Sequence, residues 1–207
     1  MSSLLWARPL WRLVSPATNV LPSSLRGALP SGGWRIYTVT PGLPRFDPSS
    51  WRLHVDGLVT QPLTLGYQEV RGLPRVEQTS DFHCVTGWSV SNVRWTGVRL
   101  HDVLAAAAPS ADAKAIEFGS ADGAYVDGLT LGQASLADVM LAYEMDGEPL
   151  SRAHGAPLRL VIPEMYGYKN VKWVNRITLS KGLSPGYWEL RGYDVDAWVG
   201  RSNGYGA

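Results

Sequence analysis

The 207-residue sequence predicts an α+β fold, with mixed sheets and short helices in one substantial domain. Three observations lead to this class: strand-like alternation recurs along the chain, the helical patterns are short, and the two kinds interleave irregularly. A doubly wound sheet would show strict alternation of strands and helices. We expect residues 1–33 to form a tail or linker and residues 34–207 to form the domain, since residues 13–33 are rich in Ser, Pro, Gly and Ala.

Three elements are expected in the first part of the domain. Alternating apolar and β-branched residues predict strands at 34–39 and 51–59. The Asp56-Gly57 pair predicts a turn after the second of these strands. Residues 64–73 predict a short helix with Thr64 as its N-cap.

Helices and strands alternate irregularly in the rest of the chain. A helix is predicted at 96–109, where Pro109 provides the stop, and a second short helix around 133–140. The apolar run 156–163 is the strongest strand pattern of the sequence. Further strand patterns cover 113–123, 140–147 and 171–180.

The composition excludes several classes of protein. The chain is 45% hydrophobic with a formal net charge of +1, which excludes a disordered chain and gives no reason to expect a nucleic-acid partner. A single cysteine excludes an intramolecular disulfide and a four-thiolate zinc site. No apolar run approaches the roughly 20 residues of a spanning helix, so no membrane span is expected. Glycine-rich dinucleotide and nucleoside-triphosphate motifs are also missing.

The start of the chain is apolar, but Arg8, Pro9 and Arg12 interrupt it and it lacks the features of a signal peptide. We expect it either to pack on the domain or be partly disordered, or to dock on a membrane or a membrane partner through Leu4, Leu5, Trp6, Leu10 and Trp11. The expected compartment is therefore the cytoplasm, with membrane association through a partner as the alternative.

The single cysteine is Cys84, in the stretch DFHCVTGWS. Polar residues 78–81 precede it and Thr86 and Gly87 follow, which is typical of a loop that presents a side chain. A thiolate in such a loop could bind a soft metal, attack a carbonyl or cycle as a redox thiol. A nucleophile needs a base, and His83 would point to the opposite face of an extended segment. An inert buried thiol is the other alternative.

A second informative stretch is residues 154–177, HGAPLRLVIPEMYGYKNVKWVNRI. Lys169 and Lys172 lie three positions apart beside Gly167, and Arg159 lies in the strand pattern before them. A glycine-containing loop with cations and free backbone N–H groups suits a phosphate or another anion. Exposed lysines at a strand end are the alternative. A thiolate together with an anion-binding loop suggests a metal carried by a phosphorylated organic cofactor.

Three motifs together resemble one family. CVTGWS, WTGVRLHDVL and HGAPLRLVIPEMYGYKNVKWV, in this order, are similar to the molybdopterin-binding domain of the sulfite oxidase family, which includes the catalytic subunit of the bacterial protein-methionine-sulfoxide reductase. The resemblance covers roughly residues 34–193. It implies a sulfite oxidase-type domain and a molybdenum–molybdopterin cofactor.

The resemblance also implies roles for particular residues. Cys84 would bind molybdenum, His154 would contact the cofactor, Arg159 would anchor its phosphate, and Tyr125 would be a catalytic residue beside the metal. The further cofactor contacts that it implies are Tyr37, Thr38, Ser120, Lys169, Asn170, Val171 and Lys172.

The implied activity is oxygen-atom transfer to or from a small substrate. Sulfite oxidases follow their cysteine with arginines that hold the anionic substrate, whereas Trp88 and Asn92 stand here and Arg94 is the nearest cation in the sequence. This departure favours a neutral substrate such as a sulfoxide. Electrons are expected to come from or go to a separate protein, such as a membrane cytochrome. The alternative functions are a non-catalytic binding module and a cysteine-dependent hydrolase.

Overall fold

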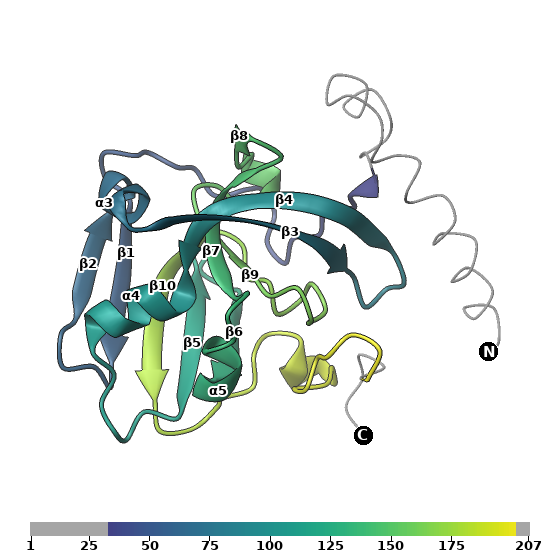
Figure 1. Cartoon of the computed structure of the whole chain (residues 1–207). Coiled ribbons are helices and arrows are strands. Elements are labelled where there is room, and N and C mark those ends of the chain that lie inside the picture. Colours follow the sequence, from purple (N-terminus) through teal and green to yellow (C-terminus); the bar gives the residue numbers. More distant parts are fainter. Residues whose placement is uncertain (1–32, 202–207) are drawn as a thin grey trace.

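The computed structural model describes residues 33–201. Within this range the chain forms two five-stranded sheets (Figure 1). The expected tail of residues 1–33, including its apolar residues, lies outside the described residues apart from Gly33. No helix of residues 33–201 has both the length and the apolar character needed to span a membrane.

The first sheet has the strand order β2-β1-β10-β5-β6, in which β1 and β10 run parallel and the other neighbours are antiparallel. Its strands are β1 (Arg52–Gly57), β2 (Leu63–Gly66), β5 (Ala115–Ser120), β6 (Val126–Thr130) and β10 (Val174–Ser180). β1 ends at Gly57, whose φ of +81° and close approach to Leu179 favour glycine. The strands predicted at 51–59, 113–123 and 171–180 are confirmed in this sheet.

The second sheet has the order β3-β4-β7-β8, and β9 pairs with residues 140–142 of β7, next to the residues 144–145 that pair with β8. Its strands are β3 (Arg75–His83), β4 (Ser89–Arg99), β7 (Met140–Met145), β8 (Glu148–Pro149) and β9 (Arg159–Val161). A tight turn at Asp146 and Gly147, both with positive φ, joins β7 to β8. The strand predicted at 140–147 is confirmed.

The β3–β4 hairpin corrects the expectation that residues 78–81 belong to a loop. They lie in β3, at the edge of the sheet, where side chains alternate between exposed and half-buried positions. A strand at a sheet edge tolerates polar residues on its outer face, so its sequence carries little apolar signal. Figure 1 shows the hairpin as a long curved ribbon, with the turn after His83 at its free end.

Two predicted strands differ from the structure. Residues 34–39 form no strand and run as an irregular segment, which we call the crossing segment (residues 33–39). The run 156–163 contains only the three residues of β9, the shortest strand after β8. Leu158, Leu160 and Ile162 are at most 1% exposed, so this apolar run reflects deep burial rather than strand length.

The helices are short; the first two begin later than predicted and the third begins earlier. They are α3 (Tyr67–Gly72), α4 (Leu100–Ala107) and α5 (Leu131–Ala134), with single 3-10 turns η2 (Arg152–His154) and η3 (Glu189–Arg191). Thr64 lies in β2, and Glu69 accepts from the Gly66 N–H at the start of α3 instead. Residues 96–99 continue β4. The helix predicted around 133–140 is α5, which begins at Leu131, where Thr130 and Gln133 form a capping box, and ends at Ala134.

The core lies between the two sheets. The larger apolar cluster joins Leu53 and Ile177 of the first sheet to Val98, Leu141 and Leu160 of the second. A smaller cluster covers the other face of the second sheet, with Trp88, Val93, Trp95, Met140 and Val161, and Trp34 of the crossing segment packs against it. The crossing segment is thus anchored on the second sheet.

Candidate functional site

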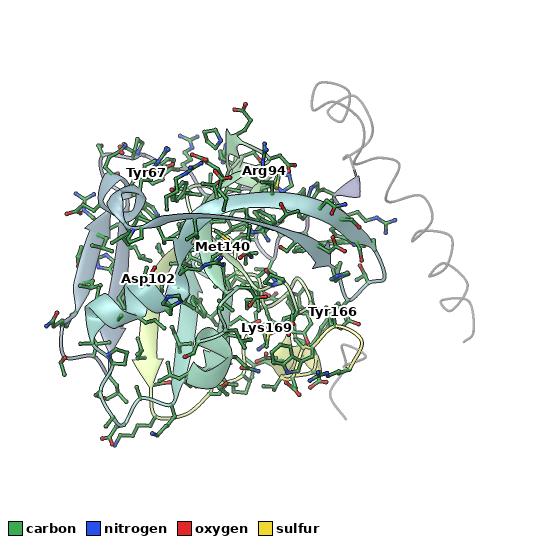
Figure 2. All side chains as sticks on the ribbon, viewed as in Figure 1. Tyr67, Arg94, Asp102, Met140, Tyr166 and Lys169 are labelled. Carbon is green, nitrogen blue, oxygen red and sulfur yellow. The ribbon has the colours of Figure 1, made fainter. Side chains whose placement is uncertain are left out.

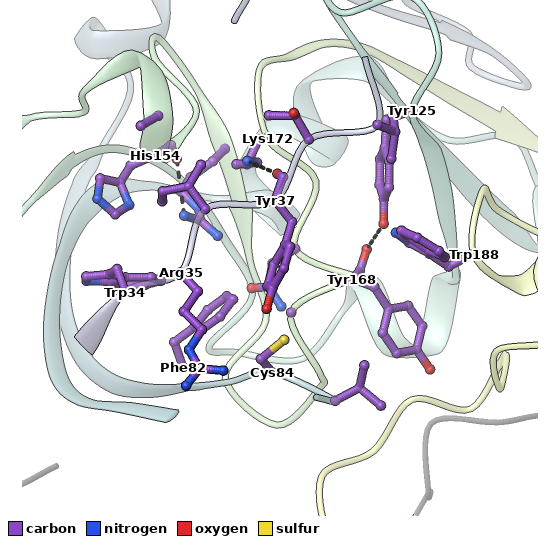
Figure 3. Close-up of a pocket in the computed structure, with 18 of the residues that line it drawn as sticks. Trp34, Arg35, Tyr37, Phe82, Cys84, Tyr125, His154, Tyr168, Lys172 and Trp188 are labelled. Atoms are coloured by element: carbon purple, nitrogen blue, oxygen red, sulfur yellow. Dashed lines mark hydrogen bonds between the residues drawn. The ribbon is translucent and has the colours of Figure 1, made fainter. Parts of the chain in front are cut away.

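A pocket forms where the crossing segment meets the ends of several elements (Figure 3). Its walls come from the crossing segment, the tip of the β3–β4 hairpin, the β5–β6 turn, η2, the loop 166–173 and the segment 188–193. These parts are distant in sequence, so the pocket exists only in the folded chain.

The hairpin tip presents the thiol. β3 ends at His83, and Cys84 then donates its backbone N–H to Trp88 O (2.9 Å) and accepts from Gly87 N–H (3.0 Å). Gly87 has a φ of +92°, which this turn requires. Cys84 Sγ lies 3.1 Å from Thr86 Oγ1 and lines the pocket, and Figure 3 shows the sulfur directed toward its interior.

His83 does not share the pocket with Cys84. Its Nδ1 lies 2.8 Å from Ser89 Oγ, and its side chain is not among the residues that line the cavity. The expectation that His83 points away from the thiol is therefore confirmed. Gly167 N–H donates to His83 O (2.7 Å), and a Cβ atom at Gly167 would collide with Phe82, so the loop 166–173 packs directly on the hairpin end.

A buried guanidinium, that of Arg159, also lines the pocket beside His154, which Figure 3 shows with Lys172 away from Cys84. Arg159 is 2% exposed, and its Nη1 donates to His154 O (3.1 Å) while its buried Nε has no hydrogen-bond partner among the described residues. It lies over the rings of Trp95 (4.9 Å) and Phe82 (5.6 Å). Burial lowers the pKa of Arg159 to about 10, and no carboxylate offsets this effect.

Two further basic groups face the same end. Lys172 donates from Nζ to Tyr37 O (2.7 Å), and burial, followed by the charge of Arg159, lowers its pKa to about 8. Burial and then the charges of Arg159 and Lys172 lower the pKa of His154 to about 4, and its buried Nδ1 has no partner among the described residues. Gly155 permits this grouping, since a Cβ atom there would lie 3.0 Å from Lys172 Cβ and 3.2 Å from Arg159 Cβ. Repelling cations with unused donors suit a bound anion.

The β5–β6 turn and the loop 166–173 supply neutral polar groups. Ser120 Oγ accepts from Asp122 N–H (3.3 Å), and Asp122 in turn accepts from Tyr125 N–H (2.8 Å). Tyr125 donates its hydroxyl to Tyr168 O (2.5 Å). Burial first, and the nearby Asp127 second, raise the pKa of Tyr125, so its phenol stays protonated at neutral pH.

Most of the residues predicted from the sequence meet in this one pocket. Nine of the eleven line it: Tyr37, Thr38, Cys84, Ser120, Tyr125, His154, Arg159, Asn170 and Lys172. Asn170 also accepts from Ile162 N–H (2.7 Å) through Oδ1, which fixes the loop to the end of β9.

The other two predicted residues do not line the pocket. Lys169 is 1% exposed, and its ammonium forms ion pairs with Asp127 and Glu189. The prediction that this ammonium contacts a ligand in the pocket is therefore wrong. Val171 is buried in the main core, its N–H donates to Lys169 O and its carbonyl accepts from Leu160 N–H. Its backbone groups are therefore already satisfied.

Several pocket residues escaped the sequence analysis. Arg94, the cation nearest to Cys84 in the sequence, is on β4 and does not line the pocket. Figure 2 places it far from the Tyr166–Lys169 loop. Arg35 of the crossing segment lines the pocket together with Arg159 and Lys172, and it was not predicted. Half of the other unpredicted lining residues are aromatic: Trp34, Phe82, Trp88, Tyr168, Trp173, Trp188 and Tyr193. The high tryptophan content of the sequence was the one indication of an aromatic pocket, but aromatic residues that pack in an ordinary core give the same content.

The metal-binding capacity of the described residues is limited. No group of three His, Cys, Asp or Glu side chains in residues 33–201 comes close enough to hold an ion. A metal at Cys84 would therefore need further ligands from a bound molecule.

The sequence comparisons agree on one family. Residues 40–188 match the family described as "Oxidoreductase molybdopterin binding domain". The uncharacterized oxidoreductase YuiH of Bacillus subtilis is 38% identical over 154 residues, which cover 73% of this chain and 77% of that protein. Sulfite oxidase of Arabidopsis thaliana is 34% identical over 180 residues, covering 70% of this chain and 46% of that protein.

Two further matches extend the comparison. The protein-methionine-sulfoxide reductase catalytic subunit MsrP of Campylobacter jejuni is 30% identical over 160 residues, covering 70% of this chain and 54% of that protein. The crystal structure of the sulfane dehydrogenase SoxCD from Paracoccus pantotrophus aligns with a TM-score of 0.63 and 25% identity, over 73% of this chain and 42% of that one. This chain thus spans about half the length of the sulfite oxidase and reductase relatives.

Proposed function

The chain belongs to the oxidoreductase molybdopterin binding domain family, and from this premise we propose that it is a molybdenum cofactor-dependent oxidoreductase. Its reaction is oxygen-atom transfer to or from a small sulfite- or sulfoxide-like substrate. The relatives named as a sulfite oxidase and a sulfoxide reductase support this reaction class.

One observation carries the proposal: the pocket that contains the Cys84 thiol also contains a buried, uncompensated guanidinium. The unused Nε of Arg159 and the unused Nδ1 of His154 are buried polar atoms that a phosphate oxygen or a pterin heteroatom would satisfy. A thiolate is also the ligand type that a soft redox metal prefers. The residues present therefore fit a molybdopterin that carries molybdenum.

The cofactor contacts divide between the two ends of the pocket. Arg159, Lys172 and His154 hold the phosphate end, and Cys84 is the metal ligand and catalytic residue at the other end. Tyr37, Thr38, Ser120 and Asn170 line the space between these ends and are proposed to contact the organic part of the cofactor.

The bound cofactor supplies the two-electron oxygen-atom transfer itself. The chain contributes orientation: the turn hydrogen bonds of Cys84 position its side chain, and Tyr125 lines the pocket as a protonated phenol whose hydroxyl is held by Tyr168 O. The aromatic lining, including Trp88 and Trp188, limits the water that reaches the substrate. In the reductive direction a sulfoxide, two electrons and two protons give a sulfide and water.

Electrons are proposed to come from or go to a separate redox protein, such as a membrane cytochrome. The relative MsrP is named as a catalytic subunit, which supports a division of the reaction between chains. Residues 34–207 are proposed as the oxidoreductase domain and residues 1–33 as its tail. The proposed compartment is the cytoplasm, with membrane association through the redox partner as the alternative, and cell fractionation would separate the two.

Metal analysis tests the proposed function. The chain is purified from a host that makes molybdopterin, and molybdenum and pterin are measured per chain for the unmodified protein and for C84S. We expect about one molybdenum per chain, reduction of dimethyl sulfoxide by a reduced viologen dye or oxidation of sulfite, and an activity loss of more than about a hundredfold in C84S. A folded C84S protein with unchanged activity would contradict the assignment of Cys84, and a metal-free active protein would contradict the function.

A further inference from the structure

A buried ion cluster of Lys169, Asp127 and Glu189 lies behind one wall of the pocket. Lys169 belongs to the loop that Figure 2 labels at Tyr166 and Lys169. Lys169 donates from Nζ to Asp127 Oδ1 (2.8 Å), to Gly128 O (3.0 Å) and to Glu189 Oε1. The three ionic side chains are each 1% exposed. All three protons of the ammonium are used inside the cluster, so it has no donor left for a ligand.

Each member of the cluster is close in the chain to an aromatic residue that lines the pocket. The pairs are Asp127 with Tyr125, Lys169 with Tyr168, and Glu189 with Trp188. The three pairs come from β6 and the turn before it, from the loop between β9 and β10, and from η3. One ammonium therefore joins the three parts of the chain that make this wall.

The aromatic residues also contact one another. Tyr125 donates its hydroxyl to Tyr168 O, and the Tyr168 ring lies 5.3 Å from the ring of Tyr193. The ring of Trp188 lies 5.1 Å from Tyr193 on its other side. The position of Tyr168 thus determines both the acceptor of the Tyr125 hydroxyl and the packing of the segment 188–193.

We propose that Lys169 is a positioning residue, which holds Tyr168 and the segment 188–193 in place so that Tyr125 keeps its position in the pocket wall, with its hydroxyl bonded to Tyr168 O. The part of this inference that concerns turnover rests on the proposed function. The part that concerns the wall rests on the buried contacts alone.

The charges of the cluster explain why the cation is needed. Two buried carboxylates repel each other, and burial raises the pKa of Asp127 to about 7 even though Lys169 acts in the opposite direction. Glu189 also accepts from Gly186 N–H (2.5 Å), at a position where a Cβ atom would collide with Asp127. Without the ammonium, this close approach of η3 to β6 loses its attraction. A shift of about 1 Å at a catalytic group can lower a rate by roughly a hundredfold.

A double-mutant cycle between Lys169 and Tyr125 tests the role in turnover. The kcat for dimethyl sulfoxide, with a reduced viologen dye as electron donor, is measured for the molybdenum-loaded unmodified protein, K169M, Y125F and the double variant. We expect K169M to lower kcat about ten- to a hundredfold in the unmodified background and less than about threefold in Y125F, because Lys169 acts through Tyr125. Equal losses in the two backgrounds, or no loss from K169M, would overturn the proposal.

Hydrogen exchange tests the wall without any activity. In K169M, the amides of Asn170 and Tyr187, which donate to Gly167 O (3.1 Å) and Val126 O (2.8 Å), should exchange faster by a larger factor than the amides of the β3–β4 hairpin, whose exchange changes only with the global stability. An equal acceleration at these two amides and in the hairpin, or unchanged exchange at the two amides, would contradict the positioning role. If the loaded protein turns over neither dimethyl sulfoxide nor sulfite, the proposed function fails while the exchange result still decides whether Lys169 holds the wall.

Two variants control these measurements. If K169M does not fold, E189Q replaces it, because Lys169 then keeps Asp127 as its counter-ion while the tie to η3 weakens. R71M removes the cation of the Arg71–Glu144 pair (3.0 Å), which does not line the pocket, and should leave both kcat and the two amides unchanged.

Discussion

Lys169 and Lys172 lie three residues apart in one loop, yet their ammonium groups have opposite surroundings. Lys169 sits between two buried carboxylates, whereas Lys172 shares the pocket with Arg159 and has only a backbone carbonyl, Tyr37 O, as its hydrogen-bond acceptor. A buried cation that carboxylates compensate serves the fold. Lys172 forms no ion pair within residues 33–201, and the charge of Asp122 opposes its pKa shift less than burial and Arg159 produce it. The cations of the pocket therefore suit an anionic ligand, and the same loop has one structural and one ligand-facing lysine.

Removing Lys169, whose charge two carboxylates compensate, should give the largest effect on stability. We expect K169M to lower the free energy of unfolding by about 3–5 kcal/mol, because Asp127 and Glu189 stay buried without a counter-ion. Urea unfolding of the cofactor-free protein measures this loss. The triple variant K169M/D127N/E189Q should recover most of it, and a triple variant as unstable as K169M would show that packing rather than charge is responsible.

Removing Arg159, a cation of the pocket, should affect ligand binding instead. We expect R159M to change the free energy of unfolding of the cofactor-free protein by no more than about 1 kcal/mol, because the lost desolvation of the guanidinium offsets its lost ring contacts. The affinity for molybdopterin should fall by about 1.5–3 kcal/mol, or roughly ten- to a hundredfold. Pterin content after extended dialysis measures this affinity. Unchanged retention would contradict the claim that Arg159 binds the ligand whereas Lys169 stabilises the fold.

The pH dependence of cofactor retention gives the smallest predicted effect. The pKa of Lys172 is about 8 in the cofactor-free pocket, and a bound phosphate would raise it. Binding therefore takes up a proton above pH 8, and affinity should fall as pH rises past 8, by at most about tenfold per pH unit. Retention between pH 7 and pH 10 measures the slope. K172R keeps its charge over this range and should show a flatter profile.

The sequence predicted the composition of the site better than its geometry. Cys84, His154 and Arg159 were identified from motifs and they line one pocket, although the sequence places them as much as 75 residues apart. Lys169 could not be distinguished from Lys172, because its partners Asp127 and Glu189 come from remote segments that meet it only in the fold.

The secondary structure shows a similar division. β1 and β10 were predicted because their apolar residues face the core, whereas β3 was missed because its edge position allows polar residues. The apolar run around β9 suggested a long strand, but burial on all sides produces the same sequence pattern in a strand of three residues.

The hydrogen bond from Lys172 to Tyr37 O joins residues that are 135 positions apart in sequence. A contact of this separation closes a very large loop, so it forms after the local hairpins and carries a high entropic cost during folding. Residues 33–39 are synthesised long before Lys172, so this contact cannot form until the chain has been made through residue 172. We therefore expect this side of the pocket to close late in folding, when a bulky prosthetic group can still enter.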